Sequence, residues 1–162
     1  MRREQLAEGV EPDDLTVGTA AEHIVCADLL LSGYRAFLAG QHCPFDVAVE
    51  CGGRLVRVQV KATRVPKPIP QRANCIPTPA YQWFVRRAGK GGRRLYGAAE
   101  FDLLALVALD VRRIAYLPAS SSAQTIHIRT HDHAGPPANG GKSGKTFGQY
   151  PFRAALEAVL NA

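Results

Sequence analysis

The run of residues from 55 to 61 constrains the fold of this chain more than any other stretch. Apolar and polar side chains alternate along it, in the order Val56, Arg57, Val58, Gln59, Val60 and Lys61. Side chains on a β-strand point alternately to opposite faces, so the valines share one face and the polar residues share the other. Because a Gly52-Gly53 pair precedes the run, and two glycines favour a tight turn, the pattern predicts a hairpin with one apolar face.

The strand before this turn is predicted at residues 45–50. Alternation places Asp46 and Glu50 on the same face of that strand. Glu50 would lie about 13 Å along the strand from Asp46, so it is interpreted as a surface charge. Asp46 can instead converge with Gln59 and Lys61 across the hairpin.

A helix is predicted ahead of the hairpin. Thr16 or Thr19 can cap its start, and Thr19 with Glu22 three residues later forms a capping-box pattern. The helix is expected to end near Gly33, since glycine is favoured just beyond helix C-termini. Residues 1–15 are then left as a flexible polar arm.

The remaining pattern predicts one domain built mainly from strands. Further strands are expected at residues 34–39, 81–87, 93–96, 103–109, 113–117 and 125–129. Five prolines between residues 64 and 80 exclude a regular helix or a central strand there. The domain is predicted to span residues 16–118, followed by a loop-rich segment at 119–150 and a helix at 151–162 that packs on the same domain.

The composition indicates a soluble globular protein and disfavours several other classes. No apolar run approaches the ~18 residues that span a membrane, so no membrane partner is expected. The polar N-terminal residues are unlike a signal peptide, and we therefore expect an intracellular, cytoplasmic protein. The four cysteines contain no C-x-x-C pair, which disfavours a zinc ribbon.

The charge distribution suggests a nucleic-acid partner. The net charge is +6, and no acidic residue occurs between Glu50 and Glu100. Clustered Lys and Arg side chains that neutralise phosphates are the main sequence-independent source of nucleic-acid affinity. The candidate DNA-binding residues in and beside this stretch are Arg57, Arg64, Lys67, Arg72, Arg86, Arg87, Lys90, Arg93 and Arg94. The alternative is a solvated basic face with no partner.

The side chains around the hairpin suit phosphodiester hydrolysis. Mg²⁺ prefers oxygen ligands and is typically held by one or two carboxylates. Asp46, the side-chain amide oxygen of Gln59 and the Val60 carbonyl can offer such ligands. Lys61 could contact the scissile phosphate or position the attacking water. Glu22 could support the site if the predicted helix packs across the sheet.

This combination resembles the PD-(D/E)XK nuclease superfamily. The order helix with Glu22, strand with Asp46, hairpin, and strand with Gln59-x-Lys61 carries the resemblance. The Q-x-K form is most similar to the group I intron homing endonuclease branch, and archaeal Holliday-junction resolvases are also similar. The later segment from Phe101-Asp102-Leu103 to Tyr116-Leu117-Pro118 looks like that branch too. The resemblance covers roughly residues 16–118.

The resemblance implies an α/β fold with a restriction-endonuclease-like core of αβββαβ type, in which helices flank a central mixed sheet. It implies a metal-dependent DNA endonuclease that hydrolyses phosphodiester bonds in duplex or branched DNA, using Mg²⁺ with Mn²⁺ as a substitute. Asp46, Gln59, Lys61 and Glu22 would be the catalytic residues. A homodimer or higher oligomer is expected, in a prokaryotic, phage or mobile-element setting.

Two other functions remain open on the sequence alone. Gln59 stands where the superfamily motif has an acid, which removes one negative charge from the metal site. The chain could therefore be a catalytically inactive DNA-binding module of the same fold. It could also be a structural or toxin–antitoxin-like interaction protein whose basic surface is incidental.

Overall fold

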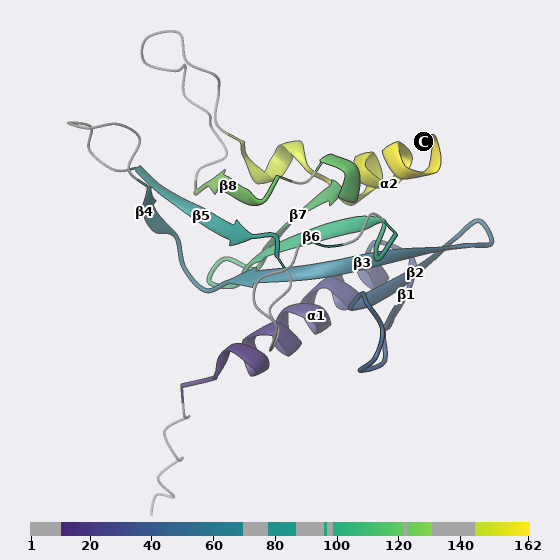
Figure 1. Ribbon diagram of the computed structural model, residues 1–162, viewed down its shortest axis with the longest axis horizontal. Coiled ribbons are helices and arrows are strands. Elements are labelled where there is room, and N and C mark those ends of the chain that lie inside the picture. The colour runs from purple at the N-terminus through teal and green to yellow at the C-terminus, as the bar shows by residue number, and fades with distance from the viewer. Residues whose placement is uncertain (1–10, 70–77, 87–95, 97–98, 122, 131–144) are drawn as a thin grey trace, which may run out of the picture.

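The computed structural model describes residues 11–69, 78–86, 96, 99–121, 123–130 and 145–162. Within these residues a five-stranded sheet forms the centre of the molecule (Figure 1). Its strands, in spatial order, are β1 (Arg35–Leu38), β2 (Val47–Cys51), β3 (Arg54–Thr63), β6 (Leu103–Ala108) and β7 (Arg113–Pro118). Strands β3 and β6 are parallel and the other neighbours are antiparallel, so the predicted mixed sheet is confirmed.

The predicted hairpin joins β2 and β3. Its turn residues Gly52 and Gly53 have φ angles of 57° and 78°, in the left-handed region that glycine adopts without strain. Two consecutive positive φ angles match the right-handed twist of the paired strands, which explains the two glycines. The pairing ends with Val47 opposite Val58, and Asp46 directly precedes this pair.

A smaller sheet covers part of the central one. It contains β4 (Lys67–Ile69), β5 (Thr78–Phe84) and β8 (Thr125–Arg129), with β5 in the middle. Pro79 is tolerated in β5 because it pairs only with β4, whereas β8 pairs with β5 from Ala80 onwards. Strand β8 lies in the segment that was expected to be rich in loops, at the residues predicted for a strand.

Two α-helices occur in the described residues, and they are α1 (Asp14–Leu31) and α2 (Phe152–Leu160). The predicted C-terminal helix at 152–160 is confirmed, whereas the predicted start of α1 is wrong. Asp13 caps α1, because its carboxylate accepts a hydrogen bond of 2.8 Å from the Thr16 amide. Gly33, with a φ of 87°, follows the helix as expected.

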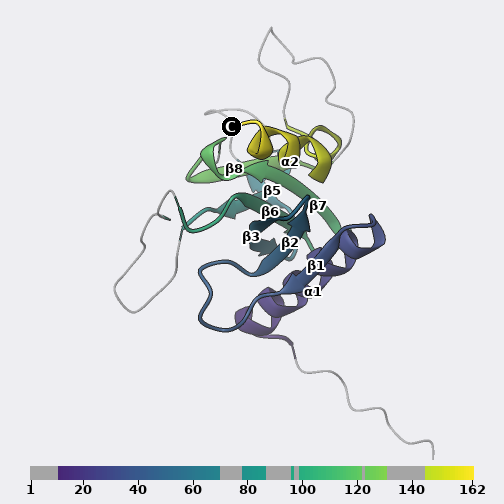
Figure 2. The same ribbon diagram turned by 90° about the vertical axis from the view of Figure 1, so that its right-hand side faces the viewer.

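Helices α1 and α2 contribute to one core cluster, while the smaller sheet and a 3-10 turn, η3 (Phe147–Gln149), contribute to the second. In Figures 1 and 2, α1 lies below the sheet, against β1 to β3, and α2 lies on the opposite side of the view, next to β7. A second 3-10 turn, η1 (Ala119–Ser121), follows β7. Of the helices expected to flank the mixed sheet, the described residues contain two, α1 and α2. Between β3 and β6, the described residues contain two strands and no helix, so the expected αβββαβ order is not found there.

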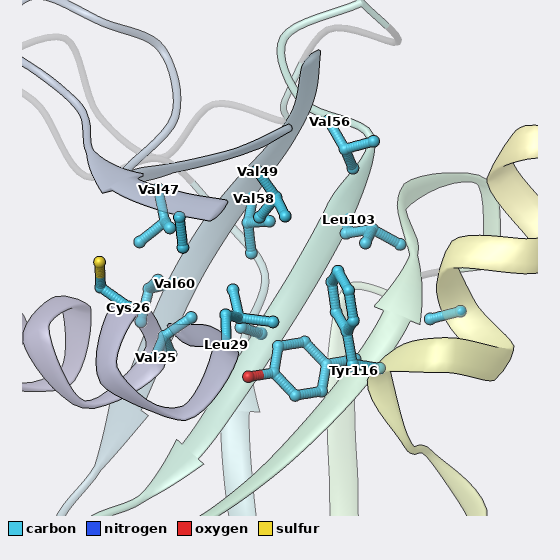
Figure 3. Packing of buried hydrophobic residues seen from close by; sticks show 14 of the residues in the cluster. Val25, Cys26, Leu29, Val47, Val49, Val56, Val58, Val60, Leu103 and Tyr116 are labelled. Atoms are coloured by element: carbon cyan, nitrogen blue, oxygen red, sulfur yellow. The ribbon is translucent and has the colours of Figure 1, made fainter. Parts of the chain in front are cut away.

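The valine face of β3 forms the core beneath α1 (Figure 3). Helix α1 presents Ala21, Val25 and Leu29 at a spacing of four residues, and each is fully buried. These side chains pack with the valines of β2 and β3 and with alternate residues of β6. The buried valines of this layer are Val25, Val47, Val49, Val56, Val58, Val60 and Val107.

The other face of β6 and β7 forms a second core with the smaller sheet. Its members include Leu104 and Leu106 from β6 and Trp83 from β5. The Trp83 indole donates a hydrogen bond of 3.3 Å to the Val107 carbonyl, which satisfies its buried N–H. Tyr96 packs against this second core, and Lys61 near the end of β3 lies over the Tyr96 ring.

Several predictions concern residues outside the described part of the chain. The expected arm is described only from residue 11 onwards, and the expected strand at 93–96 only at Tyr96. No described helix is long and apolar enough to cross a membrane.

Candidate active site

The candidate site lies where the ladder between β2 and β3 ends. The Asp46 amide donates to the Val58 carbonyl at 3.0 Å, and the Asp46 carbonyl accepts from Ala39 at 2.8 Å. The next amide of β3, that of Val60, donates to a side chain instead of a strand carbonyl: it bonds Oδ2 of Asp46 at 2.6 Å. Asp46 therefore directly precedes β2. The predicted strand at 45–50 had placed Asp46 inside the strand.

Gln59 lies next to this carboxylate and is only 8% exposed. Its Nε2 donates a hydrogen bond to the Oδ2 of Asp46. The same nitrogen lies 3.5 Å from the Val60 carbonyl oxygen. The two side chains and the main chain of Val60 thus meet at one point, as the alternation along β3 predicts.

Lys61 is half-buried beside the same group. Burial lowers the pKa of the Lys61 ammonium, and the nearby charge of Asp46 opposes this shift only in part. The Lys61 Nζ lies 5.2 Å from the centre of the Tyr96 ring, within the range of a cation–π contact. Tyr96 in turn packs edge-on against Phe101, with ring centroids 5.0 Å apart. The charge of Lys61 is therefore placed between a carboxylate and an aromatic face.

Glu22 reaches the region from α1. Its carboxyl is half-buried, and burial raises its pKa. The charge of Asp46 raises the pKa of Glu22 further, while His23 lowers it to a smaller extent. Glu22 belongs to α1 and Asp46 directly precedes β2, so the two carboxyls that influence each other come from separate elements.

These residues form a donor set that suits a hard divalent cation. The Asp46 carboxylate, the Val60 carbonyl, the Gln59 amide oxygen and the Glu22 carboxylate are all oxygen ligands. Burial is the main cause of the raised pKa of both Asp46 and Glu22, and a nearby cation would favour their ionised forms. No cluster of three or more His, Cys, Asp or Glu residues occurs in the described part of the chain, so the amide and main-chain oxygens would be needed.

Arg57, one of the predicted DNA-binding residues, is engaged in hydrogen bonds within the protein. Its Nε and Nη2 donate to the Asp102 carboxylate at 3.1 and 2.9 Å, and its Nη1 donates to the Ala99 carbonyl at 2.5 Å. The Arg57 amide also donates to Asp102, at 2.8 Å. These bonds hold β3 against the residue that precedes β6.

The other predicted DNA-binding residues are described only in part. Arg64 forms ion pairs with Glu11 at 2.9 Å and Asp14 at 3.6 Å, which ties the end of β3 to the start of α1. Lys67 is exposed on β4, and Arg86 donates to the Gln124 side chain at 2.5 Å. The remaining predicted positions lie outside the described residues, and they are Arg72, Arg87, Lys90, Arg93 and Arg94.

Tyr96 is the residue at this site that the sequence pattern did not indicate. It lies 35 positions after Lys61 and belongs to no regular element. The only available signal was an aromatic residue within the acid-free basic stretch, and that signal is equally consistent with core packing.

Comparisons with known proteins identify the family and the fold of this chain. The family model described as PD-(D/E)XK endonuclease matches residues 13–143. Among solved structures, the chain is similar to a bacterial homing endonuclease, I-Ssp6803I, with a TM-score of 0.65 and 17% sequence identity. The similarity covers 93% of this chain and 95% of that chain, and at this identity it shows a shared fold. No curated protein matches the sequence. Since the family model spans most of its length, the chain belongs to the PD-(D/E)XK endonuclease family.

Proposed function

We propose that this protein is a metal-dependent DNA endonuclease that hydrolyses phosphodiester bonds in duplex or branched DNA. Membership of an endonuclease family supports the reaction class. The observation that carries the proposal is the meeting of Asp46, Gln59 and the Val60 main chain at the open end of one ladder, with Lys61 beside them.

The proposed cofactor is Mg²⁺, with Mn²⁺ as a substitute. The Asp46 carboxylate, the Gln59 amide oxygen and the Val60 carbonyl would hold it, and Glu22 would add an outer carboxylate. A bound divalent ion supplies an activated water and stabilises negative charge that develops on a phosphate. The protein contributes a fixed carboxylate, because the Val60 amide holds Oδ2 of Asp46 at 2.6 Å.

Lys61 is proposed to act on the scissile phosphate or on the attacking water. Its lowered pKa brings proton transfer closer to neutral pH than an exposed lysine would allow. The Tyr96 ring limits where the ammonium can lie, since it contacts Lys61 from one side. A positioned ammonium is more useful than a free one, because the reacting groups must meet in a defined geometry.

DNA is proposed to approach over the basic segments that follow β3. Lys67 on β4 and Arg86 at the end of β5 lie in the described part of this region. Contacts from several such side chains would give a salt-dependent affinity that does not depend on sequence. Cutting both strands of a duplex usually needs two sites, so a homodimer or higher oligomer is proposed as the active form.

A catalytically inactive DNA-binding module is the second candidate. The observation that favours it is the amide of Gln59, which brings no charge to a site where two carboxyls already have raised pKa values. A lower charge weakens the binding of a divalent cation.

A cleavage assay distinguishes the two candidates. Supercoiled plasmid and branched DNA are incubated with the wild-type protein in Mg²⁺, Mn²⁺ or EDTA. The Lys61→Ala variant is expected to lose about 100-fold or more of the rate. Lys145→Ala is the matched control, because Lys145 is exposed and follows the smaller sheet. Identical behaviour of the wild type and Lys61→Ala in every condition would refute the catalytic assignment.

DNA affinity measured against salt concentration tests the binding surface that both candidates share. A surface that neutralises phosphates loses affinity steeply as salt rises. An affinity that does not change with salt would instead support an interaction protein with an incidental basic surface.

A further inference from the structure

The amide nitrogen of Gln59 contacts the same two oxygens that are proposed to hold the cation. It donates to Oδ2 of Asp46 and lies 3.5 Å from the Val60 carbonyl oxygen. Oδ2 of Asp46 also accepts the Val60 amide at 2.6 Å. Two N–H donors therefore satisfy this carboxylate oxygen from within the protein, in a place where Gln59 is almost fully buried.

The orientation of this amide follows from its surroundings. If the Gln59 oxygen faced the same point, it would meet a carboxylate oxygen and a carbonyl oxygen, both of which can only accept hydrogen bonds. The nitrogen has two protons to donate, and it faces two acceptors. The terminal torsion of glutamine is broad, so turning the amide group costs little apart from the hydrogen bonds that it breaks.

We propose that Gln59 is an exchangeable side chain at the metal site, which donates from its nitrogen when no cation is bound and presents its oxygen when one binds. The inference rests on the proposed function and deepens it. A cation held by Asp46 and the Val60 carbonyl competes with the amide N–H for the lone pairs of these oxygens, and it repels the positive end of the amide dipole. The opposite end of the same group is a suitable oxygen ligand for Mg²⁺.

This exchange explains why a glutamine at position 59 can serve where the family motif has an acidic residue. A glutamate there would place a further acceptor against Asp46 and Val60 and would leave Asp46 without a side-chain donor. The fold near the end of β3 would then need the cation to bring these oxygens together. Glutamine lets the same site form in either state, at the cost of weaker cation binding.

Thermal unfolding of the full chain tests the exchange without relying on activity. The melting temperature is measured in EDTA and across a Mg²⁺ titration for wild type, Gln59→Glu and Gln59→Leu. The control is Gln82→Glu, the same change at a half-buried position on β5. In EDTA, Gln59→Glu is expected to melt about 5 °C below wild type, because a hydrogen bond to a charged group is replaced by repulsion.

Added Mg²⁺ is expected to raise the melting temperature of Gln59→Glu more than that of wild type, and that of Gln59→Leu less. The reason is that a ligand which binds only the folded state stabilises it in proportion to its affinity. Gln82→Glu should respond to Mg²⁺ as wild type does. If Gln59→Glu is as stable as wild type in EDTA, the donor role is refuted.

A second measurement uses the wild type alone, so it does not depend on whether a variant folds. The side-chain amide signals of Gln59 in a ¹H–¹⁵N spectrum are expected to move at the Mg²⁺ concentrations that raise the melting temperature. Signals that stay in place over that range would refute the exchange and leave the proposed metal site standing. An absence of any Mg²⁺ or Mn²⁺ effect on melting would refute both the exchange and the metal-dependent function.

Discussion

Two aspartates accept backbone N–H groups from the same strand, and they differ in what else surrounds them. Asp46 accepts from Val60 at 2.6 Å, and Asp102 accepts from Arg57 at 2.8 Å. Each stands one residue before a strand that flanks β3, Asp46 before β2 and Asp102 before β6. In both places a carboxylate continues a hydrogen-bond ladder past the end of the neighbouring strand.

The surroundings of the two carboxylates shift their pKa values in opposite directions. Burial alone would raise the pKa of Asp102, but hydrogen bonds and charge from Arg57 outweigh burial and lower it. Burial raises the pKa of Asp46, and the Val60 amide, Lys61 and Gln59 oppose this only in part. Asp102 has its counter-ion within the protein and is structural. For Asp46 the groups within the protein do not offset burial, so its pKa stays raised.

Removing the charge at each position should separate these roles. Asp46→Asn is expected to reduce the cleavage rate by about 100-fold or more, while it keeps the packing of the site. Rates are measured on plasmid DNA in saturating Mg²⁺, with the melting temperature of each preparation beside them. A variant that cleaves at the wild-type rate would show that Asp46 is not part of the reaction.

Asp102→Asn should have the reverse effect. It leaves the Arg57 guanidinium, whose side chain is 32% exposed, without its anion, and the expected loss is about 1–3 kcal/mol of unfolding free energy. The rate per folded molecule should be close to that of wild type. Denaturant unfolding followed by cleavage assays below the transition checks both statements. A large loss of rate without a loss of stability would contradict the structural assignment.

The two carboxylates should also give stability opposite dependences on pH. Asp102 has a lowered folded-state pKa, so its contribution is present above the unfolded-state pKa and is lost as pH falls through the folded value. Asp46 has a raised pKa, so the folded state binds its proton more readily and stability falls as pH rises through that region. Melting temperatures in EDTA, compared between wild type and each Asn variant across acidic pH, measure both slopes. If the melting temperatures of Asp46→Asn and Asp102→Asn differed from wild type by the same pH dependence, the proposed opposite roles of the two carboxylates would be contradicted.

The smallest expected effect concerns Tyr96. Tyr96→Leu removes the aromatic face from Lys61, and the expected loss of cleavage rate is about 2- to 30-fold, since a cation–π contact contributes about 0.5–2 kcal/mol. Tyr96→Phe keeps the ring and should retain most of the rate. The pH–rate profile of Tyr96→Leu should shift relative to wild type, because the environment of the Lys61 ammonium changes. An unshifted profile would limit Tyr96 to a packing role.

Sequence pattern predicted β3 and its hairpin closely, because an alternating run and two glycines are local signals. It did not predict where α1 begins. Asp13, Thr16 and Thr19 are all capable caps, and the structure uses Asp13. Arg64, from the end of β3, forms an ion pair with Asp14 in the first turn, which is a contact that no local pattern contains.

The candidate site residues were also predicted from a local pattern. Contacts with residues far along the chain were not predictable in this way. Gln59 and Lys61 belong to one strand, and the partner Asp46 is joined to them by a two-residue turn. Arg57 belongs to that strand too, yet its role depends on Asp102, which is 45 positions away. A side chain on the polar face of a strand can face DNA or a distant carboxylate, and its position in the sequence does not distinguish them.

The sequence by itself determined the strand pattern, the hairpin and the Q-x-K residues with their family resemblance, since these depend on spacing within a few residues. Only the tertiary structure decided which basic side chains form ion pairs within the protein, which elements cover each part of the sheet and which of the two aspartates has a raised pKa. Those outcomes depend on burial and on charges brought together from distant segments. Burial and long-range pairing exist only once the chain has folded.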